Sequence, residues 1–274
     1  MVQTDGLERR VANVIRQLPP VPESVNALLA AATACRECTP EVLELIKSDP
    51  GLCVELLRLA NSPCYGGAET VETAAEAIDC VGVWGLAQLV GSEFARESIQ
   101  REFASHADVE GYLAHSRDIS QSARILAKLS GLAPHEQEVY TVAGLIHDIG
   151  RLIMMVASGP TGAPLAGTTW QQMHTIVEDE REAMGMDHCE VGMRVCRKWR
   201  LTPFLQEMVF RHHTPLLDDD FSFAGALVFV SHFVSASDFT GETLSALLPE
   251  EVLTNLNLTP DDIDRAQAMY RGEA

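Results

Sequence analysis

Apolar residues recur along most of the chain at the three- and four-residue intervals that place them on one face of a helix. After Asp49-Pro50, for example, they fall at Leu52, Leu56 and Leu59. The strict alternation of apolar and polar residues that is typical of strands joined by hairpin turns is absent. We therefore predict an all-α, multi-helical protein.

A capping residue followed directly by proline recurs and predicts where helices begin. A hydroxyl or carboxylate before the helix accepts a backbone N–H bond, and proline fits the first helical position because no N–H is needed there. The occurrences are Thr39-Pro40, Asp49-Pro50, Thr202-Pro203 and Thr259-Pro260. The apolar run from Leu227 to Val230 suits a strand when taken alone, but it has no evident partner strand, so we assign it to a buried helix.

The distribution of histidine divides the chain into two halves. All 9 histidines lie at or after His106, and none lies before it. We therefore predict a boundary near this point, with one helical half over residues 8–105 and another over residues 106–274. The segment from Gly159 to Pro164 is predicted to be a loop that interrupts the second half. Metal or acid–base chemistry is expected in this second half.

Composition and charge narrow the classes of partner. The chain has 274 residues, of which 46% are hydrophobic, and a formal net charge of −19. Such a surface repels phosphate backbones and anionic lipid, which argues against nucleic-acid and membrane binding. We find neither a signal-peptide pattern nor an apolar run of about 18 residues, so we expect a cytoplasmic protein. The 7 cysteines are an odd number in a long chain and predict reduced thiols.

The most informative segment runs from Gly144 to Leu152, where His147 and Asp148 stand side by side among apolar residues. Burying a carboxylate is costly unless a cation or several hydrogen bonds compensate it. We place both residues within one long helix. Adjacent helical side chains diverge by about 100°, so a metal between them would need ligands from other helices. His115 is predicted to face inward with Ile119, and further candidates are His188, His212, His213 and His232.

Histidine and aspartate without thiolates suit a divalent transition metal such as Fe, Mn, Co, Ni or Zn. Such an ion can lower the pKa of a bound water and orient a phosphate for hydrolysis. Taken singly, each histidine is better explained as an ordinary core or surface residue, and it is the gathering of several in one half around His147-Asp148 that suggests a metal. We keep the ordinary interpretation for His106, His135 and His174, because nothing around them suggests a ligand.

The cysteines and the acidic run near the C-terminal end receive ordinary structural interpretations. Cys35 and Cys38 form a lone Cys-x-x-Cys pair that lacks a second pair for zinc and does not follow a strand, so we regard it as incidental. Small core positions are predicted for Cys53, Cys64 and Cys80. The run Asp218-Asp219-Asp220 is predicted to be a solvated loop, with a flexible acidic ligand as the alternative.

Several segments together resemble a known family. They are Leu18–Pro22, Ser48–Pro50, Leu56–Ser62, Tyr65-Gly66, Ala77-Ile78, Val81-Gly82, His115-Ser116, Gly144–Arg151, Gly185–Gly192, Trp199 and His212–Pro215. In these segments the chain resembles the HDOD family, helical relatives of HD-domain phosphohydrolases in bacterial signalling, over about residues 8–240. The resemblance implies an N-terminal HDOD-specific helical half packed on a C-terminal HD-like half.

The resemblance also implies a site. The metal ligands of the related HD-GYP phosphodiesterases, or neighbours of those ligands, correspond here to His115, His147, Asp148, His188, His212 and His213. Three departures argue against catalysis. His232 stands where the closing aspartate of the HD pattern is expected, Arg151 replaces the lysine of His-Asp-x-Gly-Lys, and the Gly-Tyr-Pro segment associated with cyclic di-GMP hydrolysis is missing after His213.

Two main functional hypotheses follow. The first is a non-catalytic signalling protein that binds partner regulators, itself, or a nucleotide or phosphate ligand, with a metal in its HD-like half. The second is a metal-dependent phosphohydrolase acting on a cyclic nucleotide or another phosphate ester, with His232 replacing the carboxylate. A minor third hypothesis is a redox sensor that uses Cys35 and Cys38.

Overall fold

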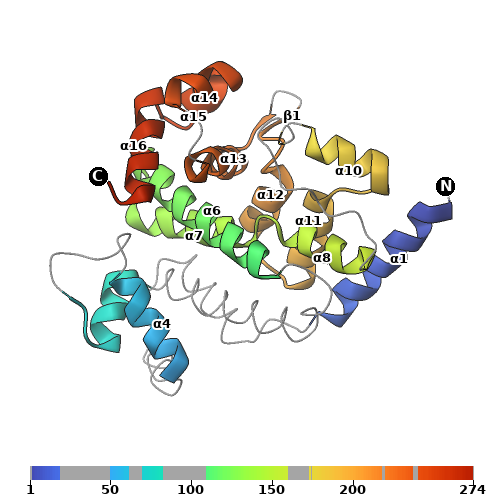
Figure 1. Ribbon diagram of the computed structural model, residues 1–274, viewed down its shortest axis with the longest axis horizontal. Coiled ribbons are helices and arrows are strands. Elements are labelled where there is room, and N and C mark those ends of the chain that lie inside the picture. Colours follow the sequence, from blue (N-terminus) through green and yellow to red (C-terminus); the bar gives the residue numbers. More distant parts are fainter. Residues whose placement is uncertain are drawn as a thin grey trace.

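A computed structural model describes residues 2–18, 50–61, 70–82, 109–159, 173, 175–217, 220–236 and 240–273 of the chain. Helices dominate this part of the protein (Figure 1). They are α1 (Val2–Gln17), α4 (Pro50–Ala60), a helix over residues 74–82, α6 (Val109–Leu129), α7 (Pro134–Ile146), α8 (Ile149–Ser158), α10 (Ile176–Met184), α11 (His188–Lys198), α12 (Pro203–Arg211), α13 (Phe223–Ser235), α14 (Gly241–Leu247), α15 (Glu250–Asn255) and α16 (Pro260–Arg271). The strands β1 (Leu216–Leu217) and β2 (Asp220–Phe221) form one short antiparallel pair. The all-α prediction is confirmed.

The predicted helix starts are confirmed wherever the structure describes them. α4 begins at Pro50, α12 at Pro203 and α16 at Pro260. The hydroxyl of Thr202 accepts a hydrogen bond from the backbone of Leu205, and Thr259 forms a reciprocal capping box with Asp262. Thr39-Pro40 lies outside the described residues. The run from Leu227 to Val230 lies within α13, as predicted.

The core lies between helices of the histidine-bearing half. α6 packs against α7 and α13, α8 packs against α11, and α12 packs against both α11 and α13. α13 is buried from Ala224 to Val234, and Phe229 and Phe233 are its largest fully buried side chains. A helix that is apolar on all sides must be surrounded by others. α13 therefore forms the centre of the bundle.

α1 lies against the same bundle although it begins the chain. Leu7 and Val11 join the main core, and α1 packs against α8 and α11. The Nε of Arg10 donates to the carbonyl of Ala157 at 2.6 Å, and the Nζ of Lys198 donates to the carbonyl of Arg16 at 2.6 Å. The predicted boundary at residue 105 falls outside the described residues and stays a prediction.

α4 and the helix over residues 74–82 lie together at the lower left of Figure 1, and hydrogen bonds join them. The Nδ2 of Asn61 donates to the carbonyl of Val71 at 2.9 Å, and the backbone of Val71 donates to Asn61 Oδ1 at 2.9 Å. The thiol of Cys80 donates to the carbonyl of Ala60 at 3.8 Å. This asparagine in the Leu-Arg-Leu-Ala-Asn-Ser motif therefore ties the end of α4 to the residues that precede the next helix.

The expectation that no apolar run is long enough to cross a membrane was wrong for one stretch. The 20 residues Val139–Ser158 are long and apolar enough to cross a membrane by length and composition alone, and 67% of an 18-residue portion of this stretch is buried inside the protein. The stretch is interrupted at His147-Asp148, between α7 and α8. It is a central pair of core helices, and its apolar character comes from that burial.

Two glycines allow the helices that carry the candidate site to approach each other closely. Gly150, in the first turn of α8, lies against the backbone of His188 and Gly192 in α11, and a Cβ at Gly150 would overlap the carbonyl of His188. Gly144 in α7 lies against α6, and a Cβ there would fall 2.6 Å from the Cα of Ser120. These contacts fix α8 against α11 and α7 against α6.

Candidate metal centre

His147 and Asp148 lie in a two-residue break between α7 and α8. α7 ends at Ile146 and α8 begins at Ile149. The prediction of one long helix through both residues was wrong, because Asp148 leaves helical geometry at φ −98 and ψ 15. Since the break removes the fixed angular spacing of a helix, both side chains can point into one space.

The other candidate ligands come from four different helices or their ends. His115 lies on α6, His188 begins α11, and His212 and His213 directly follow α12. His232 lies on α13. The structure brings all the predicted ligands together in two adjoining sets, each with its ligand atoms within 4.8 Å of one another.

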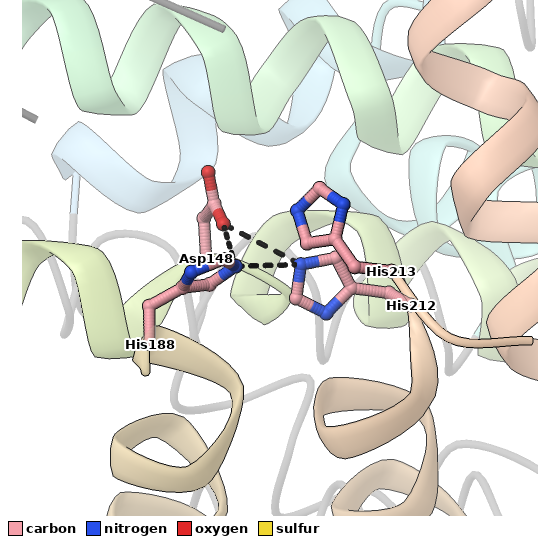
Figure 2. Close-up of side chains that lie close together, drawn as sticks. All are labelled: Asp148, His188, His212 and His213. Atoms are coloured by element: carbon pink, nitrogen blue, oxygen red, sulfur yellow. Dashed lines mark hydrogen bonds and ion pairs between the residues drawn. The ribbon is translucent and has the colours of Figure 1, made fainter. Parts of the chain in front are cut away.

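We call these groups the buried set and the outer set. The buried set is Asp148, His188, His212 and His213 (Figure 2), and the outer set is His115, His147 and His232. All four members of the buried set are buried. In the outer set the side chain of His115 keeps 36% of its surface exposed, so that set lies nearer to solvent.

The carboxylate of Asp148 belongs to the buried set and also contacts the outer set. Its Oδ1 is 3.4 Å from the Nε2 of His188 and 3.5 Å from the Nε2 of His212. Its Oδ2 is 3.6 Å from the Nε2 of both His115 and His147, and 3.3 Å from a guanidinium nitrogen of Arg151. Oδ1 is buried and has no hydrogen-bond partner among the described residues. One carboxylate oxygen therefore serves each set.

Backbone hydrogen bonds fix which ring nitrogen faces the centre. The Nδ1 atoms of His147, His212 and His232 lie 2.7, 2.8 and 2.9 Å from the carbonyl oxygens of Gly144, Val209 and Val228. A carbonyl oxygen only accepts, so each Nδ1 carries a proton, and in the neutral ring each Nε2 carries a lone pair. These histidines are therefore oriented as ligands.

The Nε2 atoms face one another at short range. The distance is 3.2 Å between His188 and His212, 3.2 Å between His147 and His232, and 3.3 Å between His115 and His147. Two nitrogens bound to one ion at about 2.0–2.1 Å in a tetrahedron lie about 3.3 Å apart. The spacing therefore matches that of ligands around a shared cation.

Glu180 supports the buried set from behind and was not predicted from the sequence. Its Oε2 accepts hydrogen bonds from the Nδ1 of His188 at 2.6 Å and from the backbone N–H of His188 at 2.8 Å. The sequence did contain a signal for this residue. Glu180 falls on the same face of α10 as Ile176 and Val177, and all three are buried. An acidic residue on an apolar helical face needs a partner.

Charge in the centre is distributed unevenly. Burial lowers the pKa of His147 and His213, and it lowers the pKa of His232 to about 3. Burial also disfavours protonated His212, but Cys189 and Asp148 outweigh it and raise its pKa to about 9. Burial raises the pKa of Asp148, yet the adjacent His147 imidazole and the Arg151 guanidinium outweigh it and hold that pKa well below its usual range. The metal-free protein therefore holds positive charge beside an ionised carboxylate.

A buried thiol borders the buried set, although the sequence suggested a set without thiolates. The Sγ of Cys189 lies 3.5 Å from the Nε2 of His188 and 3.8 Å from the Nδ1 of His212. Burial raises the pKa of Cys189, but the neighbouring charges of His188 and His212 outweigh it and lower that pKa to about 7.

Within the described part of the chain, no other candidate joins the two sets. The following predictions concern side chains outside the described residues: those for His106, His135, His174, Cys35, Cys38, Cys64, Asp218 and Asp219. Asp220 is exposed and pairs with Arg211 at 2.9 Å. Cys53 is half-buried, and Cys80 is exposed, so the core position predicted for Cys80 was wrong. Cys53, Cys80, Cys189 and Cys196 form no disulfide within the described residues.

The sequence model of the HDOD domain matches residues 18–215. This chain belongs to the HDOD family. Solved structures share the HDOD fold. A candidate phosphohydrolase from Shewanella amazonensis is 19% identical with a TM-score of 0.65, covering 97% of this chain and 98% of its own. An HDOD domain protein of unknown function from Geobacter sulfurreducens is 22% identical with a TM-score of 0.59, covering 97% and 90%.

Two longer proteins also match this HDOD chain. A candidate signal transduction protein from Marinobacter aquaeolei is 16% identical with a TM-score of 0.67, covering 98% of this chain and 65% of its own. An uncharacterized protein of Treponema pallidum is 23% identical over 266 residues, which are 92% of this chain and 48% of that protein. The chain thus spans about half the length of the curated relative it matches. His232 lies beyond the matched HDOD segment, yet it completes the outer set.

Proposed function

We propose that this HDOD protein is a signalling regulator whose histidine-bearing half binds a divalent transition metal. The proposal that a metal binds here rests on one observation. The Nε2 lone pairs of neighbouring histidines face each other, as those of His147 and His232 do at 3.2 Å. The Nδ1 protons of both rings are committed to backbone carbonyls. Facing lone pairs repel unless a cation lies between them, and a metal ion satisfies several of them at once.

The donors fit such an ion. They are imidazole nitrogens with one carboxylate, which suit Fe, Mn, Co, Ni or Zn. The Oδ1 of Asp148, which accepts no hydrogen bond among the described residues, supplies the negative charge that the imidazoles lack. A metal bound here would lower the pKa of its water and polarise a phosphate oxygen. The chain itself orients the rings through backbone carbonyls and, at His188, through Glu180.

The regulatory assignment rests on the departures from the HD pattern. Arg151 contacts Asp148 Oδ2 at 3.3 Å, so a guanidinium already occupies one side of the only carboxylate in the two sets. His232 adds another neutral donor in place of an anionic one. The candidate signal transduction protein from Marinobacter aquaeolei shares the fold, which supports this proposal. We propose partner regulators or a second copy as binding partners, a nucleotide or phosphate as ligand, and the cytoplasm as location.

A metal-dependent phosphohydrolase is the second candidate function, and one observation favours it. The outer set is open at His115, whose side chain is 36% exposed, and the Arg151 side chain beside it is 12% exposed. A phosphate ester could therefore reach the metal position, where Arg151 would pair with its oxygens. The candidate phosphohydrolase from Shewanella amazonensis has the same fold.

One experiment separates the two functions. Metal-loaded wild-type protein would be incubated with cyclic dinucleotides, nucleoside phosphates and bis(p-nitrophenyl) phosphate, and both binding and turnover would be measured. The regulatory proposal predicts bound metal without substantial turnover. Vigorous turnover that disappears in His147→Ala would establish the phosphohydrolase instead. Protein that takes up no metal would contradict both.

A further inference from the structure

Glu180 is a buried carboxylate in an otherwise exposed acidic segment. Only 5% of the surface of Glu180 is exposed to solvent. Its neighbours are exposed, namely Glu178, Asp179, Arg181 and Glu182. Removing a charged group from water is costly unless a strong partner compensates it. The partner of Glu180 is His188, through both the ring and the backbone.

The contact with Glu180 distinguishes His188 from the other oriented histidines. The Nδ1 atoms of His147, His212, His213 and His232 lie against backbone carbonyls. The Nδ1 of His188 instead lies 2.6 Å from a carboxylate oxygen. An ionised acceptor strengthens the hydrogen bond and makes the opposite nitrogen a better electron-pair donor. The Nε2 of His188 is therefore the strongest imidazole donor of these five.

That donor points into the buried set. The Nε2 of His188 lies 3.4 Å from the Oδ1 of Asp148 and 3.2 Å from the Nε2 of His212. Glu180 also holds the backbone of His188, while the carboxylate of Asp187 caps α11 by accepting from the N–H of Glu190 at 2.8 Å. Both the direction and the place of the His188 ring are therefore fixed from outside the set.

The outer set lacks these advantages. The oxygen of Asp148 that faces the outer set is Oδ2, and this oxygen is also 3.3 Å from the guanidinium of Arg151. A neighbouring positive charge weakens the binding of a cation. His115 is partly exposed, so its ring is held by fewer neighbours. The two sets therefore differ in affinity for the same ion.

We propose that Glu180 is a positioning residue that, through His188, makes the buried set the first and tighter position for a divalent ion, with the outer set filled afterwards. This order of binding rests on the metal binding proposed above.

The test compares Glu180→Gln with Glu182→Gln in the full chain. Glu182 lies on the same helix and is exposed, so its variant controls for loss of one acidic charge from α10. Each protein would be stripped of metal and titrated with Zn²⁺ against a chromophoric chelator. We expect two phases in the wild type, and a 10- to 100-fold weaker first phase in Glu180→Gln. The second phase of Glu180→Gln and both phases of Glu182→Gln should match the wild type.

Two further readouts separate positioning from folding. Glu180→Asp keeps the charge on a shorter arm, so its first-phase affinity should lie between those of wild type and Glu180→Gln. The Nδ1 proton of His188 should give a downfield NMR signal that moves upfield in Glu180→Gln. Circular dichroism of the metal-free proteins checks the fold.

The outcomes are distinguishable. An unchanged first phase in a folded Glu180→Gln variant, or equal affinities of the two wild-type phases, would overturn the role of Glu180 and leave metal binding intact. Wild-type protein that binds no Zn²⁺ and no other transition metal would overturn the metal proposal itself. Intermediate affinity for Glu180→Asp together with the NMR shift would support the inference.

Discussion

Gly150 and His188 are in direct backbone contact, and this contact sets the distance between the two halves of the buried set. Asp148 lies two residues before Gly150, and His188 is the first residue of α11. A Cβ at Gly150 would overlap the carbonyl of His188 and crowd the backbone of Gly192. The separation of Asp148 from His188 therefore depends on the absence of a side chain at position 150.

Gly150→Ala should consequently weaken both the fold and the site. The added methyl group must push α8 away from α11, and overpacking of this kind costs about 1–3 kcal/mol. We expect a lower urea midpoint for the metal-free protein and weaker Zn²⁺ binding in the chelator competition. Gly6→Ala is the control, because its Cβ would lie 3.5 Å from the Arg10 guanidinium, an ordinary contact. A Gly150→Ala protein with wild-type stability and Zn²⁺ affinity would show that α8 and α11 can accommodate a methyl group at position 150.

Replacing Arg151 should strengthen binding at the outer set. The guanidinium lies 3.3 Å from Asp148 Oδ2 and competes with a cation for that oxygen. In Arg151→Gln we expect the second phase of the Zn²⁺ titration to tighten by about tenfold, the effect of removing one nearby like charge at intermediate dielectric. Arg197→Gln changes an exposed arginine on α11 and controls for net charge. If the second phase weakens instead, Arg151 supports the outer set and does not compete with it.

Metal binding at the buried set should strengthen as the pH rises. His212 has a pKa of about 9 in the metal-free protein, so below that pH its ring holds a proton that an incoming ion must displace. Despite its burial, His188 also has a raised pKa, because Cys189 and Glu180 favour its protonated ring. With one or two protons released, the apparent affinity should increase about 10- to 100-fold per pH unit from neutral pH towards pH 9. Competition titrations in matched buffers measure this slope. A flat profile would show that His212 and His188 are already unprotonated.

His232→Asp should change which metal the outer set prefers. The Nε2 of His232 lies 3.2 Å from that of His147, so residue 232 supplies one of three donors to the set. Carboxylate oxygens favour harder ions such as Mn²⁺, whereas imidazole favours Zn²⁺. We expect the ratio of Mn²⁺ to Zn²⁺ affinity for the second ion to rise in this variant. The first ion serves as an internal control, and an unchanged ratio would place His232 outside the coordination sphere.

The sequence predicted the fold class and singled out residues that lie together in the structure, for physical reasons that act locally. Threonine or aspartate before proline marks helix starts at Pro50, Pro203 and Pro260, because capping involves neighbouring residues only. The histidines and Asp148 were found because polar residues in apolar surroundings require a partner. Their assignment to one centre depended also on the resemblance to the HDOD family.

The features that the sequence did not reveal depend on contacts between distant residues. The break at His147-Asp148 occurs within a stretch whose residues favour a continuous helix, and the crossing of Gly150 with α11 lies in the same stretch. Glu180 sits in an acidic run whose other members are exposed, so only its register with Ile176 distinguishes it. The docking of α1 on α8 involves residues far apart in the chain.

Metal binding by this protein is tested most directly by the metal content of the full chain purified without chelators. Inductively coupled plasma mass spectrometry should find about one or more equivalents of Fe, Mn, Co, Ni or Zn per chain, and the content should fall sharply in His188→Ala and His147→Ala. Wild-type protein that contains no transition metal, and takes up none when each of these ions is added, would show that the clustered histidines and Asp148 are not a metal site.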